Sequence, residues 1–156
     1  MPVKVLDSGQ VVGNLEFLGS GSVPEAHPYL YNGTDTIDFG TMILASTGQP
    51  AFGCRVSRPN NLGELAGSCI ADGTTGYGVA GAAFYLNTQS VTPTYIDVNA
   101  AIHATSDTAT PALKRFRMGT VSSIDDQHEI TVMGLMTAGG KAKVAAFLVS
   151  QVAYNQ

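Results

Sequence analysis

The chain has 156 residues, of which 13% are charged, and its formal net charge is −4. A chain of this length can bury enough surface to fold as one domain without a metal or a disulfide. The acidic balance argues against nucleic-acid binding, which needs clustered lysine and arginine to displace counterions from phosphates. The charged fraction is about half the usual share and therefore predicts a weakly charged surface that suits packing against other proteins.

The first 35 residues mix short apolar runs with glycine and proline. Gly19–Ser22, Pro24 and Pro28 interrupt the pattern, so no helical period is sustained. The segment nevertheless carries apolar and aromatic residues that a disordered tail seldom retains. We expect residues 1–35 to form an extended N-terminal arm that lies on its own domain or on a neighbouring subunit.

Residues 36–156 read as a single β domain, because short β-type runs alternate with turn residues. We expect strands at Thr36–Phe39, Thr41–Leu44, Ala51–Val56, Gly78–Leu86, Thr94–Val98 and Met118–Val121. Ser57–Gly76 is rich in glycine, with Pro59, two asparagines and Asp72, and predicts a loop, the most exposed excursion of the chain. Asn99–Ala104 predicts a short helix.

The clearest local signal is C-terminal. Glu129–Met136 meets Lys141–Val152 across Thr137–Gly140, and the Gly139-Gly140 pair can take the positive φ that tight hairpin turns need. Valine and phenylalanine in the second run favour a strand over a helix. Together these runs predict a mainly β fold, a small β-sandwich or barrel with little helix.

Cys54 and Cys69 are the two cysteines of the chain. The sequence leaves open a disulfide, two buried thiols or two unrelated positions. Neither cysteine has another cysteine or a histidine at the short spacing of a structural zinc site, so we expect no metal there.

Gly76–Gly81 matches the glycine pattern G-x-G-x-x-G of dinucleotide-binding sites. Such a site needs the glycines to follow a strand and to open a crossover helix. Here a polar run precedes the motif, and the run Ala82–Asn87 after it is too short for that helix before Pro93. We interpret the motif as a glycine-rich strand entry and expect no cofactor.

Asp125–Glu129 gathers three carboxylates and a histidine between two expected strands. Neighbouring residues of a strand point to opposite faces, so a solvated turn is the simpler interpretation than a metal site. The basic cluster Lys114, Arg115 and Arg117 likewise predicts a solvated strand face, and Asn32-Gly33-Thr34, a formal glycosylation sequon, predicts a turn.

A hydrolase would need a serine or cysteine brought together with a histidine and a carboxylate. The chain has no Gly-x-Ser-x-Gly elbow, and His27, His103 and His128 lie in unrelated contexts. Triads can assemble without a local motif, so this weakens the enzyme interpretation without excluding it. We expect no catalytic residue and no enzymatic activity.

No run approaches the ~18 apolar residues of a membrane span, and the N-terminus lacks the features of a secretory signal. We expect a protein made in the cytoplasm, soluble, and not bound to a membrane.

The chain resembles the decoration or cement proteins of tailed-bacteriophage capsids. The similar pieces are Ile37–Ile43, which is like the strand entry after the arm in such proteins, Gly78-Val79-Ala80, and the hairpin Ile130–Val152. The resemblance implies a structural virion protein that binds the major capsid protein or other copies of itself as a homo-oligomer. It implies a virion location after synthesis in the host cytoplasm.

If the arm reaches across a neighbour, Phe17, Tyr29 and Tyr31 are the candidate partner contacts, because buried aromatic anchors dominate many interfaces. The alternative is a ligand-binding β-module, such as a carbohydrate-binding or adhesive domain, with Tyr77, Tyr85 and Tyr95 near loops rich in asparagine, threonine and glycine. A small enzyme with a dispersed site is the third possibility, and a pocket where His103 or His128 meets a carboxylate and a nucleophile would support it.

Overall fold

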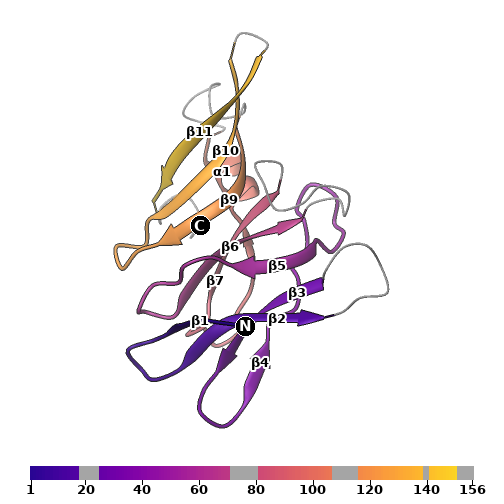
Figure 1. Cartoon of the computed structure of the whole chain (residues 1–156). Helices are drawn as coiled ribbons and strands as arrows, with labels where there is room; N and C mark the ends of the chain where they lie inside the picture. The colour runs from indigo at the N-terminus through magenta and orange to yellow at the C-terminus, as the bar shows by residue number, and fades with distance from the viewer. Residues whose placement is uncertain (18–24, 71–80, 107–115, 139–140, 151–156) are drawn as a thin grey trace.

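The computed structural model describes residues 1–17, 25–70, 81–106, 116–138 and 141–150. They form three antiparallel sheets stacked in three layers (Figure 1). The first sheet has the order β1 (Pro2–Val5), β2 (Val11–Phe17), β3 (Glu25–Tyr31), β4 (Thr36–Asp38). The second has the order β5 (Phe52–Val56), β6 (Glu64–Ile70), β7 (Ala82–Asn87), β8 (Ile96–Asp97). The third has the order β11 (Lys141–Val149), β10 (Ile130–Ala138), β9 (Phe116–Ile124). The prediction of a mainly β fold is confirmed.

The second sheet is the middle layer, and its strands contribute to two separate cores. In β6, Leu65 and Cys69 pack in one core with Val12 and Leu30 of the first sheet. Ala66, between them, packs in the other core with Val121, Ile130 and Val132 of the third sheet. The same alternation runs along β7, where Phe84 and Leu86 face the first core and Tyr85 faces the second. Successive strand residues point to opposite faces, so a sheet buried on both sides needs apolar or small residues at every position.

The expected loop over Ser57–Gly76 is wrong for residues 64–70, which form the central strand β6. Every residue of β6 is buried. Its composition, Glu-Leu-Ala-Gly-Ser-Cys-Ile, resembles a loop because the neighbours leave little room for side chains. A Cβ on Gly67 would lie 2.1 Å from the carbonyl oxygen of Arg55 and 2.5 Å from Cζ of Phe84. Close packing on both faces therefore selects the small residues that resemble loop composition.

The structure also corrects the expected extended arm over residues 1–35. The described residues of this segment form β1, β2 and β3, and β2 pairs with β3 over seven residues from Val11↔Tyr31 to Phe17↔Glu25. Leu6, Val12 and Leu30 lie in the same core as Leu65 and Phe84. The segment belongs to the folded body, because its apolar residues alternate and cover one face of the middle sheet.

Several local predictions are confirmed. Strands lie at Thr36–Asp38, Phe52–Val56 and Ala82–Asn87, and the C-terminal hairpin pairs Ile130 with Val149 through Ala138 with Lys141. The expected short helix is α1 (Val98–Ser106). Asp97 caps it, since its Oδ1 accepts hydrogen bonds from the backbone N–H groups of Asn99 and Ala100. Thr41–Leu44 differs from expectation: its β pairing is a single bridge from Ile43 to Pro50.

Cys54 and Cys69 form a disulfide between β5 and β6. The two residues are directly opposite in the strand register, and both are fully buried. The bond closes a loop of sequence separation 15 that contains the link between the strands. In the described part of the chain, no helix has the length and apolar character needed to cross a membrane.

Candidate functional site

The three predicted partner contacts lie on one side of the first sheet. Positions 25, 27, 29 and 31 of β3 are exposed or half-buried, while Ala26, Pro28 and Leu30 between them are buried. The register places each outward residue of β3 opposite one of β2. We call this surface the aromatic face; it consists of Val11, Gly13, Leu15 and Phe17 of β2 and Glu25, His27, Tyr29 and Tyr31 of β3.

Phe17 and His27 form one end of the aromatic face. Their ring centroids are 4.9 Å apart. His27 Nδ1 lies 3.1 Å from both carboxylate oxygens of Asp38 on β4, and Nε2 lies 3.3 Å from Oε1 of Glu25. The imidazole is thus held between two carboxylates and fixes the position of the phenyl ring. This end presents an aromatic surface with an acidic rim.

Tyr29 lies over Gly13 on the neighbouring strand. A Cβ on Gly13 would be 2.7 Å from Cε1 of Tyr29, so only glycine leaves room for the ring. Tyr31 is 38% exposed, and its hydroxyl donates to the carbonyl oxygen of Gly33 at 2.7 Å. Phe17 is 41% exposed. The face therefore offers aromatic rings whose positions are set by the sheet and by local contacts.

The Asn32–Thr34 sequon forms the predicted turn after Tyr31. Asn32 Oδ1 accepts hydrogen bonds from the backbone N–H groups of Thr34 and Asp35 at 2.9 and 2.8 Å. Such an Asx turn is stabilised by the side chain itself. It fixes the carbonyl of Gly33 that holds the Tyr31 hydroxyl.

A buried carboxylate network, which sequence reasoning did not find, lies between the second and third sheets. Glu64, the first residue of β6, is 3% exposed. Its Oε1 accepts from the Tyr85 hydroxyl at 2.7 Å, and its Oε2 accepts from Asn60 Nδ2 and lies 2.7 Å from His128 Nδ1. A buried charge needs such partners to offset its desolvation. The only sequence signal was a glutamate inside a glycine-rich segment.

The Asp125–Glu129 segment is the predicted turn, but it is not merely solvated. Asp125 Oδ1 accepts from the backbone N–H groups of Gln127 and Glu129 at 2.9 Å each. His128 has a φ of 64°, in the left-handed region that non-glycine residues seldom adopt. The turn joins the second sheet through His128 and Glu64, and Asn60 Nδ2 donates to the carbonyl of Asp125 at 3.0 Å. The network thus positions the turn that connects β9 to β10.

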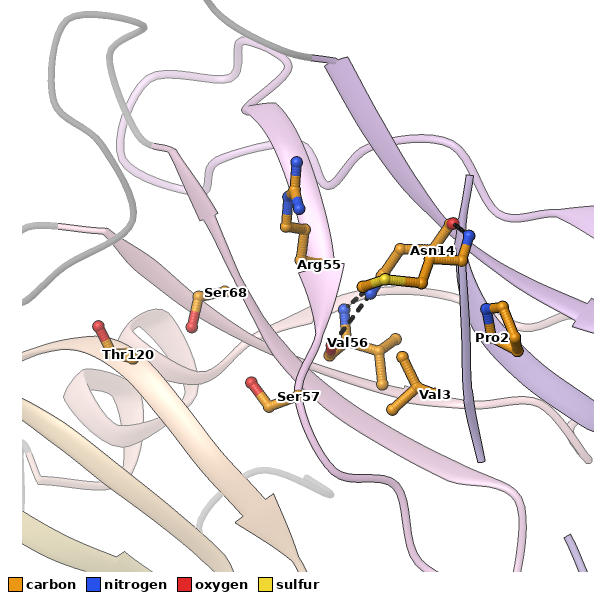
Figure 2. A pocket seen from close by; sticks show the side chains of 9 residues that line it. Pro2, Val3, Asn14, Arg55, Val56, Ser57, Ser68 and Thr120 are labelled. Carbon is orange, nitrogen blue, oxygen red and sulfur yellow. Dashed lines mark hydrogen bonds between the residues drawn. The ribbon is translucent and has the colours of Figure 1, made fainter. Parts of the chain in front are cut away.

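A cleft of about 540 Å³ lies where the sheets meet, lined by residues from β1, β2, β5, β6 and β9 (Figure 2). Figure 2 shows the paired hydrogen bonds between the Asn14 amide and the backbone of Val56. The other polar groups also join layers: Arg55 Nη1 bonds Glu16 at 2.7 Å, and Ser57 Oγ donates to the carbonyl of Val121. The N–H of Val121 donates in turn to Ser68 Oγ at 2.8 Å. The polar groups of this cleft hold the layers together.

The remaining candidates fall in less informative places. Gly76–Ala80, Tyr77, Lys114 and Arg115 lie outside the described residues. Strand β7, not a helix, begins directly after Gly81, so the arrangement needed at a dinucleotide site is absent from Gly81 onward. His103 lies in α1 and Arg117 in β9, and their side chains lie outside the described set. Among the described residues, no group of three or more histidine, cysteine, aspartate or glutamate side chains is arranged to hold a metal.

The tyrosines of the ligand-binding alternative have structural contacts. Tyr85 is buried and bonds Glu64. The Tyr95 hydroxyl donates to the carbonyl of Gly40 at 2.8 Å, and the ring packs edge-on against Phe84. Burial, with the Asp38 carboxylate as a smaller cause, raises the pKa of Tyr95 above its ordinary value.

Comparison with known proteins was made with family models, with curated sequences and with solved structures. None of them matches this chain.

Proposed function

We propose that this chain is a structural virion protein that binds an assembled capsid through the aromatic face. The observation that carries the proposal is the position of Phe17, Tyr29 and Tyr31 on one outward side of the first sheet. Aromatic side chains are enriched at the centres of interfaces, where they bury a large area for few rotatable bonds. Glu25 and Asp38 supply the polar rim that such interfaces have.

The mode of contact differs from the one that the sequence suggested. Because β1, β2 and β3 are paired with one another in a sheet, the proposal does not rest on a strand lent to a neighbour. The contact is instead made by side chains on a rigid face, which loses little conformational entropy on binding. The capsid as partner is supported by the resemblance to decoration proteins and by the charged fraction of 13%.

We infer a non-enzymatic role for the buried network. Both oxygens of Glu64 are occupied by donors from three different segments. A carboxylate used in this way orients the turn and the strands around it. The histidine-carboxylate contact therefore supports a structural function.

The test combines particle composition with rebinding. Mass spectrometry of virions from the native source is expected to find the chain at high copy number. Purified chain added back to particles depleted of it is expected to bind, and the double variant Phe17→Ser/Tyr31→Ser to bind at least about tenfold more weakly. Val91→Ser, at a fully exposed loop position, is the matched control. Absence from the particle, or equal binding by the face variant, would overturn the proposal.

A second candidate is a ligand-binding module on the same face. On this face Tyr29 lies between His27 and Tyr31 along β3 and pairs with Asp38 of β4, a combination of ring faces and hydrogen-bonding groups that fits a sugar. A glycan array distinguishes the two: binding by the wild-type chain that is lost in Tyr31→Ser favours this candidate.

A further inference from the structure

The turn that joins β3 to β4 contains the one Asn-Gly step of the chain, Asn32-Gly33. We propose that this step is a site of self-modification, at which the backbone nitrogen of Gly33 displaces ammonia from the Asn32 side chain and leaves aspartate or isoaspartate at position 32. The inference concerns the chain alone and does not rest on binding to a capsid. Either proposal can therefore fail without the other.

The reaction joins two atoms of neighbouring residues. The Gly33 nitrogen gives its proton to hydroxide and attacks Cγ of Asn32, so the new N–C bond closes an imide ring and negative charge passes to Oδ1. As the C=O bond forms again, Nδ2 takes a proton from water and leaves as ammonia, which regenerates the hydroxide. A second water molecule opens the imide on either side. One opening gives aspartate in the ordinary main chain, and the other routes the main chain through Cγ as isoaspartate.

The Asn32 side chain is folded over the peptide that must attack it. Its Oδ1 accepts hydrogen bonds from the backbone N–H groups of Thr34 and Asp35 at 2.9 and 2.8 Å. The carboxamide is thus turned toward the chain that follows Asn32, where the Gly33 nitrogen lies, and is held there instead of rotating in solvent. Holding two reacting groups together lowers the entropic part of a reaction barrier.

The same two hydrogen bonds stabilise the charge that develops during the attack. Oδ1 becomes an oxyanion but stays bonded to Cγ, so the N–H groups of Thr34 and Asp35 remain within its reach. Preorganised backbone donors of this kind stabilise the tetrahedral intermediates of acyl transfer. In the unfolded chain their place is taken by water, which must reorient as the charge forms. The folded turn should therefore promote the reaction.

The attacking and the leaving nitrogen are both accessible. None of the described residues accepts a hydrogen bond from the Gly33 N–H or from Asn32 Nδ2, and the Tyr31 hydroxyl contacts the carbonyl of Gly33 instead. Both residues of the step are exposed, so hydroxide and water reach them. A Cβ on Gly33 would meet nothing within 4 Å, and its φ of 99° is one that glycine adopts freely. The backbone therefore has room to move as the ring closes.

The other described asparagines are less suited to this reaction. Each is followed by a residue with a side chain, which crowds the nitrogen that would attack. Asn14 and Asn60 are also buried, and their Nδ2 atoms donate to the Val56 carbonyl and to Glu64. Asn32 is therefore the asparagine that we expect to react first.

The modification changes one end of the aromatic face. Either product makes the formal net charge of −4 one unit more negative. Aspartate keeps an acceptor oxygen for the N–H groups of Thr34 and Asp35, so the turn should persist. Isoaspartate adds Cβ to the main chain between Tyr31 and Gly33 and moves the carbonyl that accepts from the Tyr31 hydroxyl. In that product we expect Tyr31 to lose its contact with the turn.

The test is incubation of the full chain at mildly alkaline pH, both folded and in guanidinium chloride, with peptide mapping by mass spectrometry at intervals. Modification raises the mass of the peptide that contains position 32 by the difference between an amide and an acid. Labelled methyl groups transferred by an isoaspartyl methyltransferase measure the isoaspartate. We expect Asn32 to be modified at least as fast in the folded chain as in the unfolded chain, because the turn supplies two donors to Oδ1.

Asn32→Ser is the matched control. Its hydroxyl oxygen can accept from the Thr34 N–H, as serine does in such turns, but it has no carboxamide from which an imide can form. This variant should unfold at the temperature of wild type and show no change at position 32. Slower modification of Asn32 in the folded than in the unfolded chain would overturn the proposal, since the turn would then protect the side chain. An Asn32 that stays intact in the folded chain would do the same.

Discussion

His128 Nδ1 lies 2.7 Å from Oε2 of Glu64, although the two residues are 64 positions apart in the chain. The contact joins the turn after β9 to the first residue of the central strand β6. Tyr85 and Asn60 complete the set of donors on the same carboxylate. This network is one of the links between the second and third layers, and the first prediction concerns its energy.

Glu64→Gln is expected to lower the free energy of unfolding by about 1–3 kcal/mol, because a buried donor left unsatisfied costs that amount. Three donors meet the two carboxylate oxygens, so the amide NH₂ of glutamine must face at least one of them. Urea denaturation measures the change. Gln127→Ala is the control, since Gln127 is exposed and its described bond uses the backbone N–H. A Glu64→Gln value within about 0.5 kcal/mol of wild type, on the order of the scatter of neutral surface changes, would contradict the role of the network.

Gly67→Ala is expected to destabilise the fold by about 3 kcal/mol or more, because overpacking a rigid core forces the backbone to move. The added Cβ would lie 2.1 Å from the backbone oxygen of Arg55, which cannot rotate away. Gly9→Ala separates this steric effect from backbone strain: Gly9 has a φ of 82° and open space around it. Its expected cost is only about 1 kcal/mol. Equal melting temperatures for the two variants would show that β6 is less tightly packed.

The disulfide is expected to contribute about 3 kcal/mol, the loop-entropy value for a closed loop of about 15 residues. The double variant Cys54→Ala/Cys69→Ala should therefore melt well below wild type. Because both sulfurs are fully buried, reductant should act on the folded protein slowly and on the unfolded protein quickly. Rapid labelling of two thiols in folded protein treated with mild reductant would be inconsistent with the burial of both sulfurs.

Tyr95 gives a prediction for alkaline pH. Its pKa is raised in the folded state by burial, while in the unfolded chain it returns to about 10. The folded state therefore holds the phenolic proton that the unfolded state releases. The raised pKa of Tyr95 has no effect on the free energy of unfolding below a pH of about 10. Above that pH the free energy of unfolding falls as the pH rises. Difference absorbance of phenolate should show that Tyr95 ionises only with unfolding, and Tyr95→Phe should remove its contribution to that step. Ionisation of Tyr95 near pH 10 in the folded protein would refute this prediction.

Local sequence patterns correctly predicted the C-terminal hairpin and helix α1. The C-terminal hairpin has alternating residues and a glycine pair, and both follow from the chain itself. Helix α1 was predicted because Val98, Ile102 and the alanines near them suit a short helix. In these segments local propensity and tertiary packing favour the same structure.

Prediction failed where burial on two faces or long-range pairing decided the structure. β6 reads as a loop because its small residues are required by Arg55 and Phe84, which come from other strands. The first 35 residues read as an arm because no local signal shows that Val12 and Leu30 will cover β5 and β6. The aromatic residues Phe17, Tyr29 and Tyr31 could be selected from the sequence, but their common face depends on the β2–β3 register.

The sequence by itself determined the mainly β class, the hairpin and the turns, because alternation and glycine or asparagine chemistry act over a few residues. The tertiary structure alone decided that Cys54 bonds Cys69, that Glu64 meets His128, and that the middle sheet serves two cores. The first two relations join residues 15 and 64 positions apart, and the cores join residues further apart still. Their partners are set by sheet order and register, which depend on how all three layers pack together.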